Sequence, residues 1–143
     1  MNIIESDNRE MLDSIQSTLN LELKSEENVG ITDIWPTLGN SRYFIVTLGD
    51  KPISVATLHG YDEPELYKLY VIPSYRGKNV ARTLVEHIMS VLYQDGINEL
   101  FVEMTYSSSG FWESIAADHE VILFDGGSKV IFNTKINSDK TTL

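Results

Sequence analysis

Residues 65–89, ELYKLYVIPSYRGKNVARTLVEHIM, decide how this chain of 143 residues folds. The first part, residues 66–72, is a dense apolar and aromatic run that ends at Pro73, which is typical of a central strand buried on both faces. From residue 81 onward, and beyond this stretch to residue 92, apolar side chains repeat at helical spacing and predict an amphipathic helix. A strand that passes through a short glycine-containing loop into a helix aims the unpaired N–H groups of that helix beyond the strand end. A phosphate binds well at such a place.

The distribution of charge within this segment favours an anionic ligand. The whole chain carries 21 acidic against 11 basic side chains, which gives a formal net charge of -10. Residues 66–85 contain no Asp or Glu, yet they hold Lys68, Arg76, Lys78 and Arg82. A basic segment at a helix N-terminus is what an anionic ligand requires. The alternative is a solvated loop whose lysines and arginines serve no ligand.

Residues 69–89 resemble the acetyl-CoA-binding motif of the GCN5-related N-acetyltransferase (GNAT) superfamily. In that motif a strand ending in LYV, a proline two residues on, and RGxG with a small residue lead into an apolar helix. The resemblance implies that backbone groups near Leu69, Tyr70 and Val71 pair with the pantetheine arm as an added strand. It also implies that Gly77 allows close backbone approach to the pyrophosphate. The N–H groups implied to hold the pyrophosphate belong to Arg76, Gly77, Lys78, Asn79, Val80 and Ala81, with charge added by Arg76, Lys78 or Arg82.

Two positions depart from the family pattern. Ser74 stands where the phosphate motif usually begins with Gln or Arg, although that position varies widely. Asn79 replaces the second glycine. Because asparagine tolerates left-handed backbone better than most other residues, we expect the loop to keep its shape. The Asn79 side chain could still crowd a phosphate and weaken the affinity.

The rest of the chain predicts further helices and strands. Asp7 and Glu10 resemble a capping box for a helix over residues 7–19, and residues 20–40 are expected to form a loop with at most one short helical turn. A short helix is expected around residues 111–115, with N-cap candidates at residues 107–109. The predicted strands cover residues 42–48, 52–59, 66–72, 97–105, 121–124 and 129–136, and the first two and the last two form hairpins.

This order of elements predicts an α/β fold of the α+β type. We expect a mixed, largely antiparallel sheet flanked by helices, which is the arrangement of the GNAT-like acyl-CoA N-acyltransferase fold. The length suits one core, so we expect a single domain over residues 1–137 and a flexible tail over residues 138–143.

Transfer of an acetyl group from a thioester to an amine needs a neutral amine, and a carboxylate can take its proton through water. Glu103 is the first candidate, because on the predicted strand 97–105 it would look toward the gap beside residues 66–72. The alternative is a solvated side chain at an edge of the sheet. Glu65 is the second candidate, because some family members carry a catalytic glutamate before the central strand; the alternative is a surface charge. His59 is a third candidate.

The group that protonates the departing thiolate is harder to assign. Many relatives carry a tyrosine in a segment resembling FYxxxGF, whereas this chain has FWESIA at residues 111–116, with Trp112 at the apparent tyrosine position. An indole N–H donates a hydrogen bond but is no proton source near neutral pH. Tyr106 is the nearest phenol in the sequence and our candidate acid. The alternative is that Tyr106 is a packed aromatic side chain.

These features predict an acyltransferase: an acetyl-CoA-dependent N-acetyltransferase in which a primary amine attacks the thioester directly. Acetyl-CoA would be the co-substrate, and the acidity of the chain favours a cationic small-molecule or peptide amine as acceptor. One alternative is a catalytically weak or inactive GNAT-like domain that binds acyl-CoA or a protein partner. Another is a small α/β adaptor without a nucleotide ligand.

The composition argues against several other classes of protein. An acidic chain lacks the extended basic face that nucleic acid or an anionic membrane requires. The absence of cysteine excludes disulfides and a thiol nucleophile, and three histidines without ligand spacing argue against a metal site. The sequence lacks a recognisable secretory signal and an apolar run long enough for a membrane span, so we expect a soluble cytoplasmic protein. A homodimer through the C-terminal hairpin is a further expectation.

Overall fold

The structure is a computed structural model that describes residues 1–25, 29–36, 39–104 and 108–135. Within this described part the helices are α1 (Arg9–Ser25), α2 (Val80–Gln94) and α3 (Ser109–Ala116). The strands are β1 (Asn2–Glu5), β2 (Ser41–Leu48), β3 (Lys51–His59), β4 (Glu65–Val71), β5 (Glu99–Glu103), β6 (Val121–Phe124) and β7 (Lys129–Asn133). Short 3-10 turns, η1 (Pro73–Tyr75) and η2 (Asp125–Gly127), follow β4 and β6.

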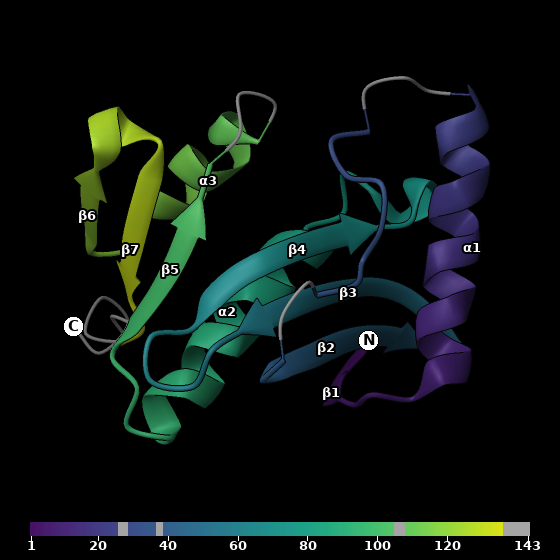
Figure 1. Ribbon diagram of the computed structural model, residues 1–143, viewed down its shortest axis with the longest axis horizontal. Coiled ribbons are helices and arrows are strands. Elements are labelled where there is room, and N and C mark those ends of the chain that lie inside the picture. Colours follow the sequence, from purple (N-terminus) through teal and green to yellow (C-terminus); the bar gives the residue numbers. More distant parts are fainter. Residues whose placement is uncertain (26–28, 37–38, 105–107, 136–143) are drawn as a thin grey trace.

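The strands form one sheet in the order β1-β2-β3-β4-β5-β7-β6 (Figure 1). Neighbouring strands run antiparallel, except for β4 and β5, which run parallel. Helix α1 crosses one face of the sheet, whereas α2 and α3 lie behind the other face (Figure 1). This arrangement confirms the predicted mixed, largely antiparallel sheet flanked by helices.

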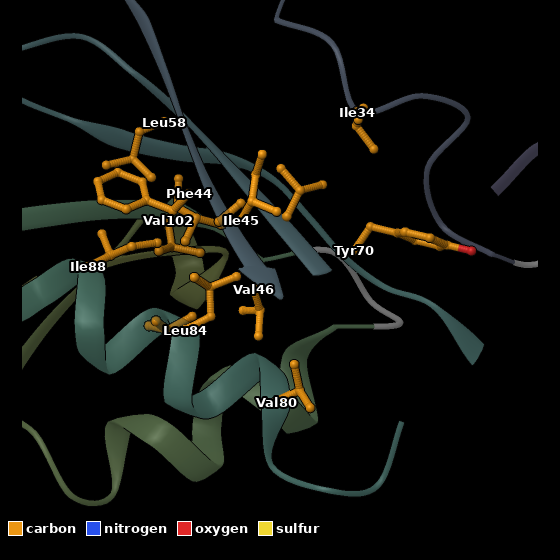
Figure 2. Close-up of a cluster of buried hydrophobic side chains, with 14 of the residues drawn as sticks. Ile34, Phe44, Ile45, Val46, Leu58, Tyr70, Val80, Leu84, Ile88 and Val102 are labelled. Atoms are coloured by element: carbon orange, nitrogen blue, oxygen red, sulfur yellow. The ribbon is translucent and has the colours of Figure 1, made fainter. Parts of the chain in front are cut away.

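Helix α2 packs its apolar face against one side of the sheet (Figure 2). Figure 2 shows Leu84 and Ile88 of α2 beside Phe44, Val46 and Val102 of the sheet. All five side chains are buried, and their removal from water is the main favourable contribution to folding. The apolar periodicity that predicted this helix therefore reflects its packing face.

The N-terminal part differs from the prediction. Residues 2–5 form the edge strand β1, which is too short to show a periodic pattern in the sequence. The predicted capping box of Asp7 and Glu10 is wrong, because Asn8 Oδ1 accepts the Met11 N–H at 3.0 Å and caps the helix instead. Helix α1 also extends to Ser25, into the segment predicted to be a loop, because Glu22 near its end accepts hydrogen bonds from Tyr70 of β4 and from Arg76 after that strand.

The C-terminal half follows the prediction with shorter strands. Strand β5 ends at Glu103 and lies between β4 and β7, so it is not a sheet edge, although the Glu103 side chain is exposed as the alternative expected. The second hairpin is confirmed, and its turn contains Gly126 with a positive φ of 69°. Ser108 occupies the N-cap position of α3, as expected from residues 107–109. The predicted tail over residues 138–143 lies outside the described residues.

Candidate functional site

The parallel strands β4 and β5 are paired only where the start of β4 meets the second half of β5, with Glu65 opposite Phe101 and Leu66 opposite Val102. Beyond these pairs the two strands diverge, as Figure 1 shows. A cavity of about 500 Å³, here called the strand-gap cavity, is lined by β4, the end of β5, the start of α3 and residues 29–31. Its volume suits a small-molecule ligand.

A β-bulge changes the direction of the side chains along β4. The register between β3 and β4 skips Tyr67, which is the extra residue of the bulge. An extra residue moves the following side chains to the other face of the sheet. Leu66 therefore shares the α2 side with its neighbour Val102, whereas Lys68 and Tyr70 reach toward α1 and the segment before β2.

The backbone of β4 faces the strand-gap cavity at alternating residues. The Tyr70 carbonyl accepts the buried Ser54 hydroxyl of β3 at 2.8 Å, so the backbone groups of Tyr70 are directed at β3. Because backbone groups alternate in direction along a strand, those of Leu69 and Val71 face the cavity. Of the three residues implied to pair with pantetheine, two present their backbone to the cavity and Tyr70 does not.

The loop between β4 and α2 contains two left-handed residues, of which Asn79 was expected to tolerate this conformation. Gly77 has φ of 76°, and Asn79, at the N-cap of α2, has φ of 60° and ψ of 21°. The first hydrogen bond within α2 is donated by Thr83 N–H to the Asn79 carbonyl, so the preceding N–H groups of the helix have no intrahelical acceptor. A hollow of about 260 Å³, here called the loop hollow, is lined by this loop and the start of α2. By contrast, the Arg76 N–H is used within the 3-10 turn, where it donates to Pro73.

Replacement of Asn79 by glycine tests the role of this left-handed position. We expect Asn79→Gly to leave the dissociation constant of CoA unchanged or lower it, because glycine keeps the conformation and removes a side chain from the loop. The free energy of unfolding should change by less than about 1 kcal/mol, since relief of strain offsets the backbone entropy of glycine. Calorimetry with CoA measures the first quantity and thermal unfolding the second. Asn40→Gly is the matched control, because Asn40 has φ of 61° in the turn before β2; clearly weaker binding by the Asn79 variant alone would contradict this account.

Most basic side chains of the acid-free segment are neutralised by carboxylates from elsewhere in the chain. Among the described residues, only Lys78 of the four forms no ion pair. The sequence could not reveal this, because most of the partners lie far away along the chain. The ion pairs are Lys68–Asp33, Arg76–Glu22 and Arg82 with both Glu86 and Asp118.

Lys51 lies beside the loop, although no pattern in the sequence indicates this position. Its ammonium group is 5.4 Å from the centre of the Tyr75 ring, and that of Lys78 is 5.3 Å from the same ring. Lys51 is the first residue of β3, so it reaches the loop only through the fold. Tyr75 lines the loop hollow, and the two lysines therefore place positive charge near it.

The candidate carboxylates meet on one side of the sheet. Glu65 and Glu103 both line a hollow of about 320 Å³, together with Glu63 and Lys129, which we call the acidic hollow. Glu103 also lines the strand-gap cavity and is the only one of these side chains to do so. His59 lies opposite Glu65 in the β3–β4 register, and the described residues supply no hydrogen-bond partner for its buried Nδ1.

The aromatic residues near α3 have a structural role. Trp112 is buried, and its ring contacts Phe111 at 4.8 Å and Phe132 at 5.9 Å between ring centres. It forms part of the cavity wall from the position where relatives carry tyrosine. The candidate acid Tyr106 lies outside the described residues. Within the described ranges, no cluster of three or more potential metal ligands occurs, and no helix is long and apolar enough to cross a membrane.

Comparisons with known proteins relate this geometry to a family. The family model described as "Acetyltransferase (GNAT) family" matches residues 9–114. A search of curated proteins finds no significant match. Among solved structures, a GNAT-family acetyltransferase from Staphylococcus aureus Mu50 is similar over 94% of this chain and 99% of its own, with 17% identity and a TM-score of 0.67.

Two further similar structures contain the cofactor. The PaiA N-acetyltransferase from Thermoplasma acidophilum in complex with coenzyme A is 16% identical, with a TM-score of 0.61, over 93% of this chain and 99% of its own. A mutant of the AtaT toxin, bound to acetyl-CoA and to the C-terminus of the antitoxin AtaR, is 21% identical, with a TM-score of 0.65, over 99% of this chain and 98% of its own. Since the family model matches well over half of the sequence and the fold agrees, the chain belongs to the GNAT acetyltransferase family.

Proposed function

We propose that the protein is an acetyl-CoA-dependent N-acetyltransferase that acts on a primary amine. The observation that carries the proposal is that the loop hollow and the strand-gap cavity share the wall residues Val71, Arg76, Ala81 and Phe111. A diphosphate at the start of α2 would therefore lie next to a pantetheine arm along β4. Along the path of that arm, Leu69 offers its backbone groups and Val71 its N–H for strand-like hydrogen bonds, because the Val71 carbonyl already accepts Arg76 Nε.

The proposed reaction is direct attack of the amine on the acetyl carbonyl carbon. The C–N bond forms, the C–S bond breaks and CoA leaves as a thiolate. Glu103, which borders both the cavity and the acidic hollow, accepts the amine proton through water, and Glu65 assists from the other side of that hollow. Tyr106 remains our proposed donor to the thiolate, and water is its substitute.

The acceptor is proposed to be a cationic amine that enters through the acidic hollow. Glu63, Glu65 and Glu103 line this hollow against the single cation Lys129, which itself is paired with Asp125. A small-molecule or peptide amine is compatible with this charge. One neighbour is named an aminoglycoside 6'-N-acetyltransferase and another a ribosomal-protein alanine N-acetyltransferase, and so both classes belong in the test. A cytoplasmic location and a homodimer remain proposals.

A second candidate function is an acyl-CoA-binding domain without turnover, which the tryptophan at position 112 favours. Release of free CoA in the presence of acetyl-CoA and a panel of polyamines, aminoglycosides and peptides separates the two functions. A thiol reagent can follow the reaction directly, because the chain contains no cysteine. Thermal stabilisation by CoA without amine-dependent release would support the second function, and absence of both would contradict the two together.

Lys78 provides a prediction about the cofactor. We expect Lys78→Ala to raise the dissociation constant of CoA by about fivefold, since it is the cation of this loop that no described carboxylate neutralises. Raised salt should reduce the difference. Lys135→Ala changes the net charge equally beyond β7 and should bind CoA like the wild type. Equal affinities of the two variants in calorimetry would remove Lys78 from the site.

A further inference from the structure

A buried carboxylate on α1 holds two residues of the cofactor site. The Glu22 side chain is only 10% exposed, although it belongs to an acidic residue on a helix surface. Its Oε1 accepts the Tyr70 hydroxyl at 2.8 Å and Arg76 Nη2 at 2.8 Å, and its Oε2 accepts Arg76 Nη1 at 2.6 Å. Arg76 lowers the pKa of Glu22, and burial with the Glu22 hydrogen bond raises that of Tyr70. The phenol of Tyr70 therefore stays protonated and donates a hydrogen bond to the Glu22 carboxylate.

Each of the three guanidinium nitrogens of Arg76 donates one hydrogen bond in this arrangement, which uses three of its five N–H groups. Besides its two bonds to Glu22, its Nε donates to the Val71 carbonyl at 3.0 Å, and the group lies 5.4 Å from the centre of the Tyr70 ring. Such a two-pronged pair fixes the orientation of the planar fork as well as its position. Arg76 is thus tied to the strand before the turn and to α1, although the residue immediately after it begins the phosphate loop.

The position of Arg76 links the two halves of the site. Arg76 lines the strand-gap cavity, the loop hollow and a third, open hollow beside Glu22 between α1 and η1. Val71 lines the first two of these as well. The Arg76 side chain therefore lies between the strand edge that would bind pantetheine and the loop that would bind the diphosphate.

We infer that Glu22 is a positioning residue for the cofactor, and that Arg76 serves as its strut and not as a phosphate ligand. The inference rests on the proposed function, because it assumes that CoA occupies these cavities. Glu22 holds Arg76 against Val71, and Arg76 in turn holds the turn before Gly77 in the shape that presents the loop N–H groups. Without the contact between Glu22 and Arg76, the residues that line the cavities stay in place, but the loop must be ordered when CoA binds. That loss of conformational entropy weakens binding.

The two roles for Arg76 predict opposite behaviour. A phosphate ligand acts mainly through its charge, so Arg76→Lys would keep much of the affinity, and Glu22→Gln would free the guanidinium and tighten binding. A strut needs the planar guanidinium group, because a lysine ammonium cannot bridge Glu22 and Val71 in the same way. Under our inference, Arg76→Lys therefore binds CoA as weakly as Arg76→Ala, and Glu22→Gln weakens binding.

Calorimetric titration of CoA into the full chain tests this inference. We expect Glu22→Gln and Arg76→Lys each to raise the dissociation constant by about tenfold while the stoichiometry stays near that of the wild type. A merely structural role would lower the stoichiometry, through loss of folded protein, and leave the dissociation constant unchanged. Tyr70→Phe, which removes one of the bonds to Glu22, should give a smaller rise and keeps the test valid if Glu22→Gln does not fold.

Asp13→Asn is the control, because it removes an exposed ion pair with Arg9 on the same helix and should bind CoA like the wild type. Unchanged or tighter binding by Glu22→Gln, or near wild-type affinity of Arg76→Lys, would overturn the inference while the proposed function stands. Failure of the wild type itself to bind CoA would instead contradict the proposed function.

Discussion

Glu103→Gln is expected to lower turnover by about 10²- to 10⁴-fold near neutral pH, the usual contribution of a general base. The amide has a nearly identical shape but cannot take the proton of the amine. Since Glu103 is exposed at the end of β5 and the substitution keeps the shape of the side chain, the dissociation constant of acetyl-CoA should stay unchanged. Raising the pH should restore part of the rate, because more of the amine is then already neutral. Initial rates of CoA release at saturating substrate, measured across pH, provide the test.

Glu99→Gln is the matched control for this prediction. Glu99 begins the same strand, is exposed, and points to the same face as Glu103, because both alternate with the buried Leu100 and Val102. It lines neither the strand-gap cavity nor the acidic hollow. The control should therefore keep the wild-type rate. Wild-type turnover by Glu103→Gln would exclude Glu103 as the base and leave Glu65 as the candidate.

Trp112→Ala is expected to lower the free energy of unfolding by about 3–5 kcal/mol, as is usual when a large buried aromatic side chain is removed. Trp112 is 4% exposed and packs against Phe111 and the fully buried Phe132. Its removal leaves a void between α3 and β7 and opens the wall of the strand-gap cavity. Denaturant unfolding measures the change.

Phe111→Ala serves as the comparison, because Phe111 lies next to Trp112 on α3 but is only half-buried. Its loss should cost clearly less stability. Equal effects of the two substitutions, or a Trp112→Ala effect below about 1 kcal/mol, would mean that the tryptophan is not part of the core. Trp112 would then have to be reconsidered as a group that acts on the ligand.

Local sequence patterns were sufficient to predict the part of the fold around the cofactor loop. The apolar run of β4, the periodic face of α2 and the left-handed Asn79 depend on neighbours within a few residues. The same is true of both hairpins, whose turns contain Gly49 and Gly126. Strand β1 and the cap at Asn8 escaped prediction, because a four-residue edge strand has no period and several polar residues there could serve as the cap.

The contacts that complete the site depend on residues far apart in the sequence. The Glu22 carboxylate meets Arg76 across 54 positions, and Lys51 reaches Tyr75 only because β2, β3 and β4 bring their ends together. The bulge at Tyr67 turns the side chain of Tyr70 toward α1, and no local sequence pattern predicts this bulge. Three of the four basic side chains of residues 66–85 therefore form ion pairs in the fold, and only Lys78 has no ion-pair partner among the described residues.

The most direct test of the account is calorimetric titration of CoA into the wild-type chain and into Gly77→Val. Gly77 has φ of 76°, and no atom outside its immediate neighbours lies within 4 Å of a Cβ built there, so valine would strain the backbone and occupy the space next to the loop without clashing with the protein. We expect binding by the wild type and a loss of at least about tenfold in affinity for the variant, with retained folding by circular dichroism. Equal affinities of the two proteins, or no binding by the wild type, would contradict the claim that this loop and the gap between β4 and β5 hold acyl-CoA.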